Sequence, residues 1–407
     1  MRIASLILIT LFAAAPSAAQ QLFRVETTVP GVGAEGNNLL GLVEDLLDQT
    51  GDFSALQAVP SYTARLDYLG VQDAVVLEVS NLGEDLTLRI PSTGAIVAFD
   101  TNSPEALEDE VETFIKRDAA DTWAAFLESM AGQSPLALLD GNPRATTALM
   151  ANSAFRRFGL NDTHSRIGYR EQEVSRFGTF GITLEVAGGP VETDDFDDLT
   201  TVDGSLEIGG EFNNTVGLAF SVIGQYRDYQ ATEMYDVGLE LGLPIRLARP
   251  TEGRHLYWAV TPVLQAAAGV SPDAAAGGLF MGGGLVNTLA LQVGPIELGM
   301  GNQLIYYGGL PVKNIQGYDF ETHLDQLILK NGLKAGFRPF ELLYAEAGLT
   351  LTNFLLGDAA LDSYWTPFVS CGLRLGRFVE LRASYEADLA KHGYRGQRGR
   401  LELGASF

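Results

Sequence analysis

Polar and apolar residues alternate along twelve segments in the second half of the chain. In segment 378–389, Leu381 and Tyr385 fall on one face of an extended strand, and Glu380 and Arg382 fall on the other, because successive side chains of a strand point to opposite faces. Each segment has roughly ten residues or more, the length that a tilted strand needs to cross a bilayer. The sequence therefore predicts a transmembrane antiparallel β-barrel of about twelve strands over residues 178–407. The segments are approximately 178–187, 201–212, 215–227, 233–246, 254–268, 277–292, 295–307, 324–338, 341–353, 363–375, 378–389 and 397–407.

The final segment ends in an aromatic residue. Leu401, Leu403 and Phe407 lie on its apolar face and alternate with residues such as Arg400 and Glu402. This pattern resembles the closing strand of bacterial outer-membrane β-barrels, and the resemblance implies that the three apolar residues form a signal for the barrel-assembly machinery. The alternative for this segment alone is an edge strand of a soluble sheet that ends in phenylalanine.

The beginning of the chain predicts export. Met1 and Arg2 precede an apolar run at 3–15, and small residues follow at 16–20, which is the pattern of a secretory signal peptide of residues 1–19. The chain is 46% hydrophobic but has no unbroken apolar stretch of the roughly 18 residues that a membrane helix needs, so an exported chain must enter a membrane as strands. The expected location is the cell outer membrane. The expected partners are outer-membrane lipids, lipopolysaccharide, periplasmic chaperones and the barrel-assembly machinery.

The connections between the predicted strands alternate in length and indicate how the barrel is oriented. Short connections at 213–214, 293–294 and 376–377 alternate with longer ones such as 188–200 and 308–323. Outer-membrane barrels have short periplasmic turns and longer extracellular loops. We therefore expect both ends of the barrel segment to lie in the periplasm.

Residues 20–160 have helical rather than alternating periodicity. They are expected to form a separate soluble α+β domain, joined to the barrel by a linker at 161–177. Ser103 and Pro104 are typical of a helix cap and first helical turn. We expect the domain on the periplasmic side of the membrane or inside the barrel as a plug. The expected elements are helices at 39–47, from 104 and from 121, and strands at 74–79, 86–90 and 95–99.

A third helix is predicted at 143–158, directly before the linker. Asn142 suits its N-cap, Pro143 its first turn and Gly159 its end, and most of its residues are small. In this respect the chain resembles autotransporter translocator units, in which a twelve-stranded barrel is preceded by a helix that occupies the pore. We expect Arg156 and Arg157 at the end of this helix to contact inward-facing carboxylates of the lumen as part of a plug, because buried carboxylates need cationic partners. The alternative is a helix docked within the periplasmic domain.

Alternation assigns many charged side chains to the inside of the barrel. Buried charges must be paired or hydrated, and two functions follow from this choice. Hydrated charges would line a narrow channel for small solutes, which is the favoured function, with the N-terminal domain as a periplasmic or plug element. Paired charges would fit a structural, assembly or surface-display barrel without conductance. The expected lumen-lining residues are Glu207, Glu211, Glu240, Glu297, Glu346, Glu380, Arg382, Glu386, Arg400 and Glu402.

Enzymatic function is the third and least favoured alternative. The chain contains no His-x-Ser pair of the kind used by outer-membrane phospholipases, and its single cysteine, Cys371, excludes an intramolecular disulfide framework and a cysteine-rich metal site. We expect no cofactor, no metal and no catalytic residues. A formal net charge of −24 argues against nucleic acid as a partner.

Overall fold

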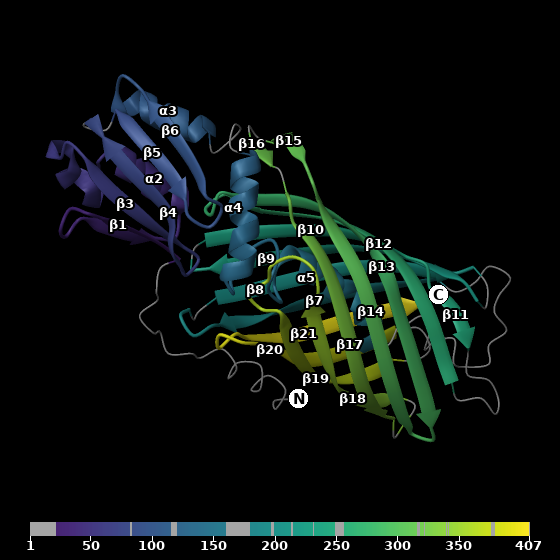
Figure 1. Cartoon of the computed structure of the whole chain (residues 1–407). Coiled ribbons are helices and arrows are strands. Elements are labelled where there is room, and N and C mark those ends of the chain that lie inside the picture. The colour runs from purple at the N-terminus through teal and green to yellow at the C-terminus, as the bar shows by residue number, and fades with distance from the viewer. Residues whose placement is uncertain are drawn as a thin grey trace.

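The structure of the chain is a computed structural model (Figure 1). It describes residues 22–406, apart from 82–83, 115–119, 160–179, 197–198, 213–214, 231, 249–255, 316–317, 321, 339, 341 and 376–378. The predicted signal peptide (1–19), the predicted linker (161–177) and Phe407 therefore lie outside the described residues. None of the described helices is long and apolar enough to cross a membrane.

Twelve long strands in the described part of the chain form an antiparallel barrel, which confirms the predicted fold class. The barrel closes through two pairings. Strands β21 and β7 pair along their length, with Leu403 opposite Leu184, and strands β10 and β12 pair with Leu239 opposite Ala266. The long strands are β7 (Phe180–Glu192), β8 (Leu199–Glu211), β9 (Gly217–Tyr229), β10 (Thr232–Gly242), β12 (Leu256–Ser271), β13 (Ala276–Val293), β14 (Ile296–Leu310), β17 (Asp325–Phe337), β18 (Leu343–Phe354), β19 (Ser363–Leu375), β20 (Val379–Leu389) and β21 (Arg395–Ser406).

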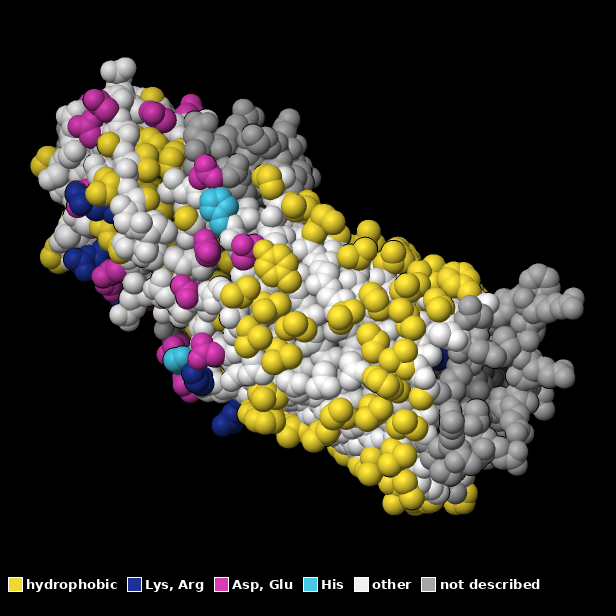
Figure 2. Space-filling model, turned by 45° about the vertical axis from the view of Figure 1, so that its right-hand side comes forward, with side chains coloured by type: hydrophobic (Ala, Val, Ile, Leu, Met, Phe, Trp, Pro, Cys, Tyr) yellow, Lys and Arg dark blue, Asp and Glu magenta, His cyan; other side chains and the backbone are white. Residues whose placement is uncertain are grey.

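Large apolar side chains cover the outside of the barrel. In β20, Leu381 and Tyr385 are 43% and 38% exposed, whereas Glu380 and Arg382 are buried, so the predicted register of this strand is confirmed. Figure 2 shows hydrophobic side chains spread over the barrel wall, while acidic and basic side chains gather over the N-terminal part of the molecule and the barrel loops beside it. A wide apolar outer surface on a barrel with a polar interior is the pattern expected in contact with lipid.

The two ends of the barrel differ in their connections. At one end, here called the loop end, strands are joined by 193–198, by 311–324 and by 355–362; at the other, here called the turn end, 294–295 is a typical connection. The β14–β17 loop also contains two short strands that were not predicted, β15 (Val312–Ile315) and β16 (Tyr318–Phe320).

The structure departs from the predicted barrel at two places: the connection predicted at 228–232, expected to be only marginally long, is a tight turn, and one predicted strand is interrupted. Strands β9 and β10 meet through a hairpin at the loop end in which Gln230 adopts a left-handed φ of 55°, which permits a tight turn. At the turn end, the predicted strand 233–246 is interrupted at 243–244, and its second part forms the short strand β11 (Ile245–Ala248). Pro244 lacks a backbone N–H and so favours this break.

Residues 22–133 form the cap, a separate layer of one sheet and several helices. Ser103 caps helix α3, accepting a hydrogen bond from the backbone N–H of Ala106 at 3.2 Å, and Pro104 is its first residue, as predicted. The sheet has six strands rather than the three predicted. Its order is β2 (Gly33–Gly36), β1 (Phe23–Thr27), β3 (Tyr62–Tyr68), β4 (Val71–Ser80), β5 (Asp85–Ile90) and β6 (Ala95–Asp100), and the helical elements are α2 (Leu39–Leu47), the 3-10 helix Gly51–Ala58, α3 (Pro104–Thr113) and α4 (Ala120–Gln133).

The cap packs against the loop end of the barrel (Figure 1). Its apolar core is continuous with barrel residues of that end, including Val191, Tyr229 and Leu361. The β12–β13 loop makes several hydrogen bonds to the cap. Asp273 O accepts from the backbone N–H of Leu39 at 2.7 Å, and Ala275 O accepts from the indole of Trp123 at 2.6 Å.

Helix α5 (Thr146–Gly159) leads from the cap into the barrel. It contacts β10, β12, β13, β14 and β17 from inside, so it occupies the lumen rather than docking within the cap. The helix begins three residues later than predicted, because residues 143–144 form a turn. The Asn142 side chain supports this turn by accepting a hydrogen bond from the backbone N–H of Arg144 at 2.8 Å.

Candidate functional site: the occupied lumen

Small side chains allow α5 to fit inside the barrel. Ala148, Ala151 and Ala154 are fully or almost fully buried against the wall. The wall is also recessed where the helix passes. A Cβ atom on Gly238 of β10 would lie 2.1 Å from the sulfur of Met150, so a glycine is required at this position while Met150 keeps its place.

The entrance to α5 is held by buried ion pairs. Arg144, which precedes the helix, is fully buried, and its guanidinium lies 3.2 Å from the carboxylate of Asp388 in β20. Thr146, the first helical residue, donates a hydrogen bond to Asp236 of β10, which is paired with Arg227 at 2.9 Å. These contacts fix the entrance of the helix to opposite sides of the wall.

Asp140 lies in the connection between α4 and α5 and is buried without a basic partner among the described residues. Its carboxylate accepts hydrogen bonds from Thr147 and from the amide of Gln326, at 2.5 and 3.1 Å. Burial raises the pKa of this carboxyl above its ordinary value, against the opposing effect of these hydrogen bonds.

The middle of the helix is held by side-chain amide groups of the barrel wall. Gln265 of β12 donates to the carbonyl of Met150 at 2.8 Å, and Gln303 of β14 donates to the carbonyl of Ala151 at 3.0 Å. Backbone carbonyls have two lone pairs and can accept from the wall in addition to their helical bond. The polar residues of these strands therefore bind the backbone of the helix, whatever its side chains are.

Arg156 anchors the last turn of α5. Its guanidinium lies 3.3 Å from the carboxylate of Glu185 in β7 and donates a hydrogen bond to the hydroxyl of Ser205 in β8. The side chain of Arg157 lies outside the described residues. A basic residue in the last turn also suits the dipole of the helix.

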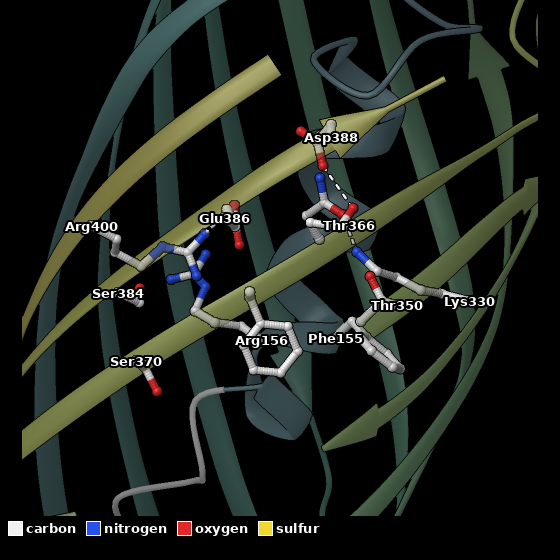
Figure 3. A pocket seen from close by; sticks show the side chains of 12 residues that line it. Phe155, Arg156, Lys330, Thr350, Thr366, Ser370, Ser384, Glu386, Asp388 and Arg400 are labelled. Atoms are coloured by element: carbon white, nitrogen blue, oxygen red, sulfur yellow. Dashed lines mark hydrogen bonds and ion pairs between the residues drawn. The ribbon is translucent and has the colours of Figure 1, made fainter. Parts of the chain in front are cut away.

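A polar chamber of about 50 Å³ remains between α5 and one side of the wall (Figure 3). Arg156 and Phe155 reach it from the helix, and Lys330, Glu386 and Arg400 reach it from the barrel strands. Its volume is enough for a few water molecules or a small ion, because a single water needs about 10–15 Å³ on this measure.

The structure places all ten predicted lumen-lining residues on the inner face of the barrel, where each has a partner. Most of these contacts connect neighbouring strands, so most of the lumen charges are paired rather than simply hydrated. The contacts are Glu207 with Ser221, Glu211 with Arg246, Glu240 with Gln265, Glu297 and Glu346 with Lys334, Glu380 with Arg374 and Arg382, Arg382 with Glu402, Glu386 with Arg398 and Arg400, and Arg400 with Glu185.

The predicted assembly signal lies on the outer face of β21 as far as the structure describes it. Leu401 and Leu403 are 55% and 46% exposed and point away from the lumen. Phe407 lies outside the described residues.

Sequence reasoning missed several residues that hold α5. Arg227 and Glu185 could have been found, because each lies in a predicted strand and alternation points it inward. Gln265 and Gln303 also face inward, but a neutral amide gives no sequence signal that it will bind a helix in the lumen. No local signal distinguishes Arg144 from a surface arginine, because its partner comes from the far end of the chain.

The described residues contain no group of three or more His, Cys, Asp or Glu side chains that could hold a metal ion. His323, one of the two described histidines, lies 3.3 Å from Asp121 of α4, so it joins the β14–β17 loop to the cap. The site thus consists of a helix, its hydrogen-bonding wall and a small polar chamber.

The fold resembles solved structures of outer-membrane barrels, whereas no family model and no curated protein matches the sequence. The translocator domain of autotransporter NalP from Neisseria meningitidis is 16% identical with a TM-score of 0.41, and the similarity covers 64% of this chain and 97% of that domain. The β-domain of a Bordetella autotransporter is 15% identical, with a TM-score of 0.41 and coverage of 56% and 100%. An outer-membrane channel from Pseudomonas putida F1 is 15% identical, with a TM-score of 0.42 and coverage of 59% and 98%.

The closed wall of twelve antiparallel strands, the apolar outer surface and the polar interior define the fold of a transmembrane β-barrel. The solved structures that the fold resembles include both translocator domains and porins.

Proposed function

We propose that the barrel anchors the cap at the outside of the cell and that α5 seals the lumen through which the two are connected. The observation that carries this proposal is the path of the chain. The cap packs at the loop end, α5 runs through the lumen, and β7 begins at the turn end, where Gly181 pairs with Ser406.

Loop length supports the outward orientation of the cap. Outer-membrane barrels direct their short turns to the periplasm and their longer loops to the outside. The β14–β17 and β18–β19 connections, 311–324 and 355–362, lie at the same end as the cap. On this orientation the cap is extracellular rather than periplasmic, which differs from the first placement expected from the sequence.

The contacts of α5 support display rather than open conductance. The inner wall uses Asp236, Gln265, Gln303 and Glu185 to bind the helix or the residues beside it. A lumen whose polar groups are engaged in this way has little free volume for solutes. The surface-display function, the second of the two expected from the sequence, is therefore the better supported.

Cysteine labelling on intact cells tests the orientation. Cys371 is exposed and is first replaced by serine. Ile96→Cys, on an exposed site of the cap, should react with a membrane-impermeant maleimide on intact cells. Phe340→Cys, an equally exposed site in a turn-end connection, should react only after the outer membrane is permeabilised. The opposite pattern would contradict the proposal.

A channel that opens when α5 leaves is the second candidate. The polar chamber beside the helix favours it, because charged and hydroxyl side chains line a space that is not filled by protein. Conductance of the intact and truncated chains in a planar bilayer separates a sealed barrel from a gated one.

A further inference from the structure

We infer that the chamber beside α5 is a binding site for one small monovalent anion, such as chloride, at Lys330. The site does not depend on the orientation of the cap. It is built by Lys330 of β17, Thr350 of β18 and the helix residues Asn152 and Phe155. Lys330 is 6% exposed, so its charge is removed from bulk water.

Among the described charged residues around the chamber, Lys330 is the one that belongs to no ion pair with a carboxylate. Arg398 lies 3.5 Å from Asp203 and 3.1 Å from Glu386, and the other arginines pair at 3.1–3.3 Å. Within the described part of the chain, four arginines thus face four carboxylates, and the ammonium of Lys330 is one positive charge in excess of this set. The arginines are Arg144, Arg156, Arg398 and Arg400, and the carboxylates are Glu185, Asp203, Glu386 and Asp388.

The ammonium of Lys330 has unused hydrogen-bond donors. An ammonium has three N–H donors, and in the described part of the chain one of them is accepted by Asn152 Oδ1 at 2.5 Å. The ring of Phe155 lies 5.3 Å from the nitrogen and offers only its π face. An excess buried charge with unused donors is costly unless a counter-charge compensates it.

Thr350 supplies a second unused donor. It is 5% exposed, and its hydroxyl has no hydrogen-bond partner among the described residues. Thr350 and Lys330 lie on neighbouring strands and both line the chamber (Figure 3). A buried ammonium and an unused hydroxyl donor on the same small chamber form a site for an acceptor that carries negative charge.

The size and charge of the chamber limit the ligand. A volume of about 50 Å³ holds a single-atom anion with a few waters. One excess positive charge matches a monovalent ion, whereas sulfate or phosphate would bring a second charge without a partner. Chloride and bromide are therefore the appropriate probes.

The test is the thermal stability of the purified full chain in detergent, measured as the temperature at which its folded, fast-migrating gel band is lost. At equal ionic strength, sodium chloride should raise this midpoint by about 2 °C or more relative to sodium gluconate. Lys330→Met should abolish the shift. Lys391→Met is the matched control, because Lys391 is exposed and pairs with Asp362 outside the chamber, and it should keep the shift.

Thr350→Val keeps the inference testable if Lys330→Met does not fold. It removes one hydroxyl and preserves the shape of the side chain, so it should reduce the chloride shift by at least half. An anomalous bromide peak beside Lys330 in crystals grown with sodium bromide is the direct support. Absence of a chloride shift in the unmodified chain, or an equal shift in the Lys330 variant, would overturn the inference.

Discussion

The guanidinium of Arg144 lies 3.2 Å from the carboxylate of Asp388, and both groups are buried. Arg144 belongs to the turn that leads into α5, and Asp388 lies near the end of strand β20 in the barrel wall. The pair therefore joins the plug directly to the barrel at the end where the cap sits.

Arg144→Ala should destabilise the folded chain strongly. The substitution leaves the Asp388 carboxylate buried without its partner, and removal of one member of a buried pair costs about 3–5 kcal/mol in the free energy of unfolding. Adding Asp388→Asn should restore part of the loss, because the uncompensated charge disappears. Denaturation in detergent, followed by gel mobility, measures both. Arg65→Ala is the control, since Arg65 forms an exposed pair with Asp73 in the cap; if both arginine variants lose equal stability, the pair does not hold the plug.

Gly238→Ala should displace the side chain of Met150. The added Cβ would lie 2.1 Å from its sulfur, and because this atom is near the end of a flexible side chain, the loss of stability should fall at the low end of the roughly 1–3 kcal/mol of overpacking. Gly204→Ala is the matched control, because its Cβ would meet only one backbone oxygen at 3.5 Å. Met150→Ala combined with Gly238→Ala should lose less than the sum of the two single variants. Strict additivity would show that the two residues do not touch in solution.

Removal of residues 20–160, with the signal peptide retained, should open the lumen. Removal of residues 22–133 alone takes away the cap but leaves α5, so conductance in a planar bilayer should stay low. Arg156→Glu should raise conductance of the full chain, because it faces Glu185 with a like charge. Normal gel mobility is required of each variant as evidence of an intact barrel. Equal conductance of both truncated chains would mean that α5 does not close the lumen.

Asp140→Asn should change how stability depends on pH. Burial raises the pKa of Asp140 in the folded protein, so the folded state favours the protonated carboxyl. The Asp140 carboxyl therefore adds its full contribution to the free energy of unfolding below the ordinary aspartate pKa of about 3.9. This contribution is lost as pH rises through the higher pKa of the folded protein. The variant should gain stability relative to the unmodified chain as pH increases over this range. A constant difference between pH 4 and 8 in the midpoint of thermal unfolding would contradict the raised pKa.

The barrel could be predicted because its signal is local. One face of every barrel strand is apolar and the other is polar. Because successive side chains of a strand point to opposite faces, the alternation of apolar and polar residues predicts that Leu381 points outward and Glu380 inward. The cap was harder to predict. Strand β3 (Tyr62–Tyr68) also alternates between buried and more exposed residues, yet a short alternating segment between helices gives little evidence by itself.

The contacts of the plug could be predicted only in part. Alternation indicates that Arg400 faces inward, but not that it shares Glu185 with Arg156 of the helix. Such pairings depend on the depth and rotation of α5, which are set by packing between distant segments. The position of the cap is also set by contacts between distant segments, because Trp123 and Leu39 of the cap form hydrogen bonds with the β12–β13 loop.

The path of α5 limits the order in which the molecule can be made. A helix with its side chains is about 10–12 Å across, and the chamber beside α5, as its described lining residues define it, measures about 50 Å³. The cap, with its six-stranded sheet, is far wider than one helix. On the proposed orientation the cap must cross the membrane as an unfolded chain or before β7 and β21 join, and it contains no cysteine whose disulfide could hold it folded. Folding of the cap against the loops would then make export irreversible, because the folded domain is too large to return.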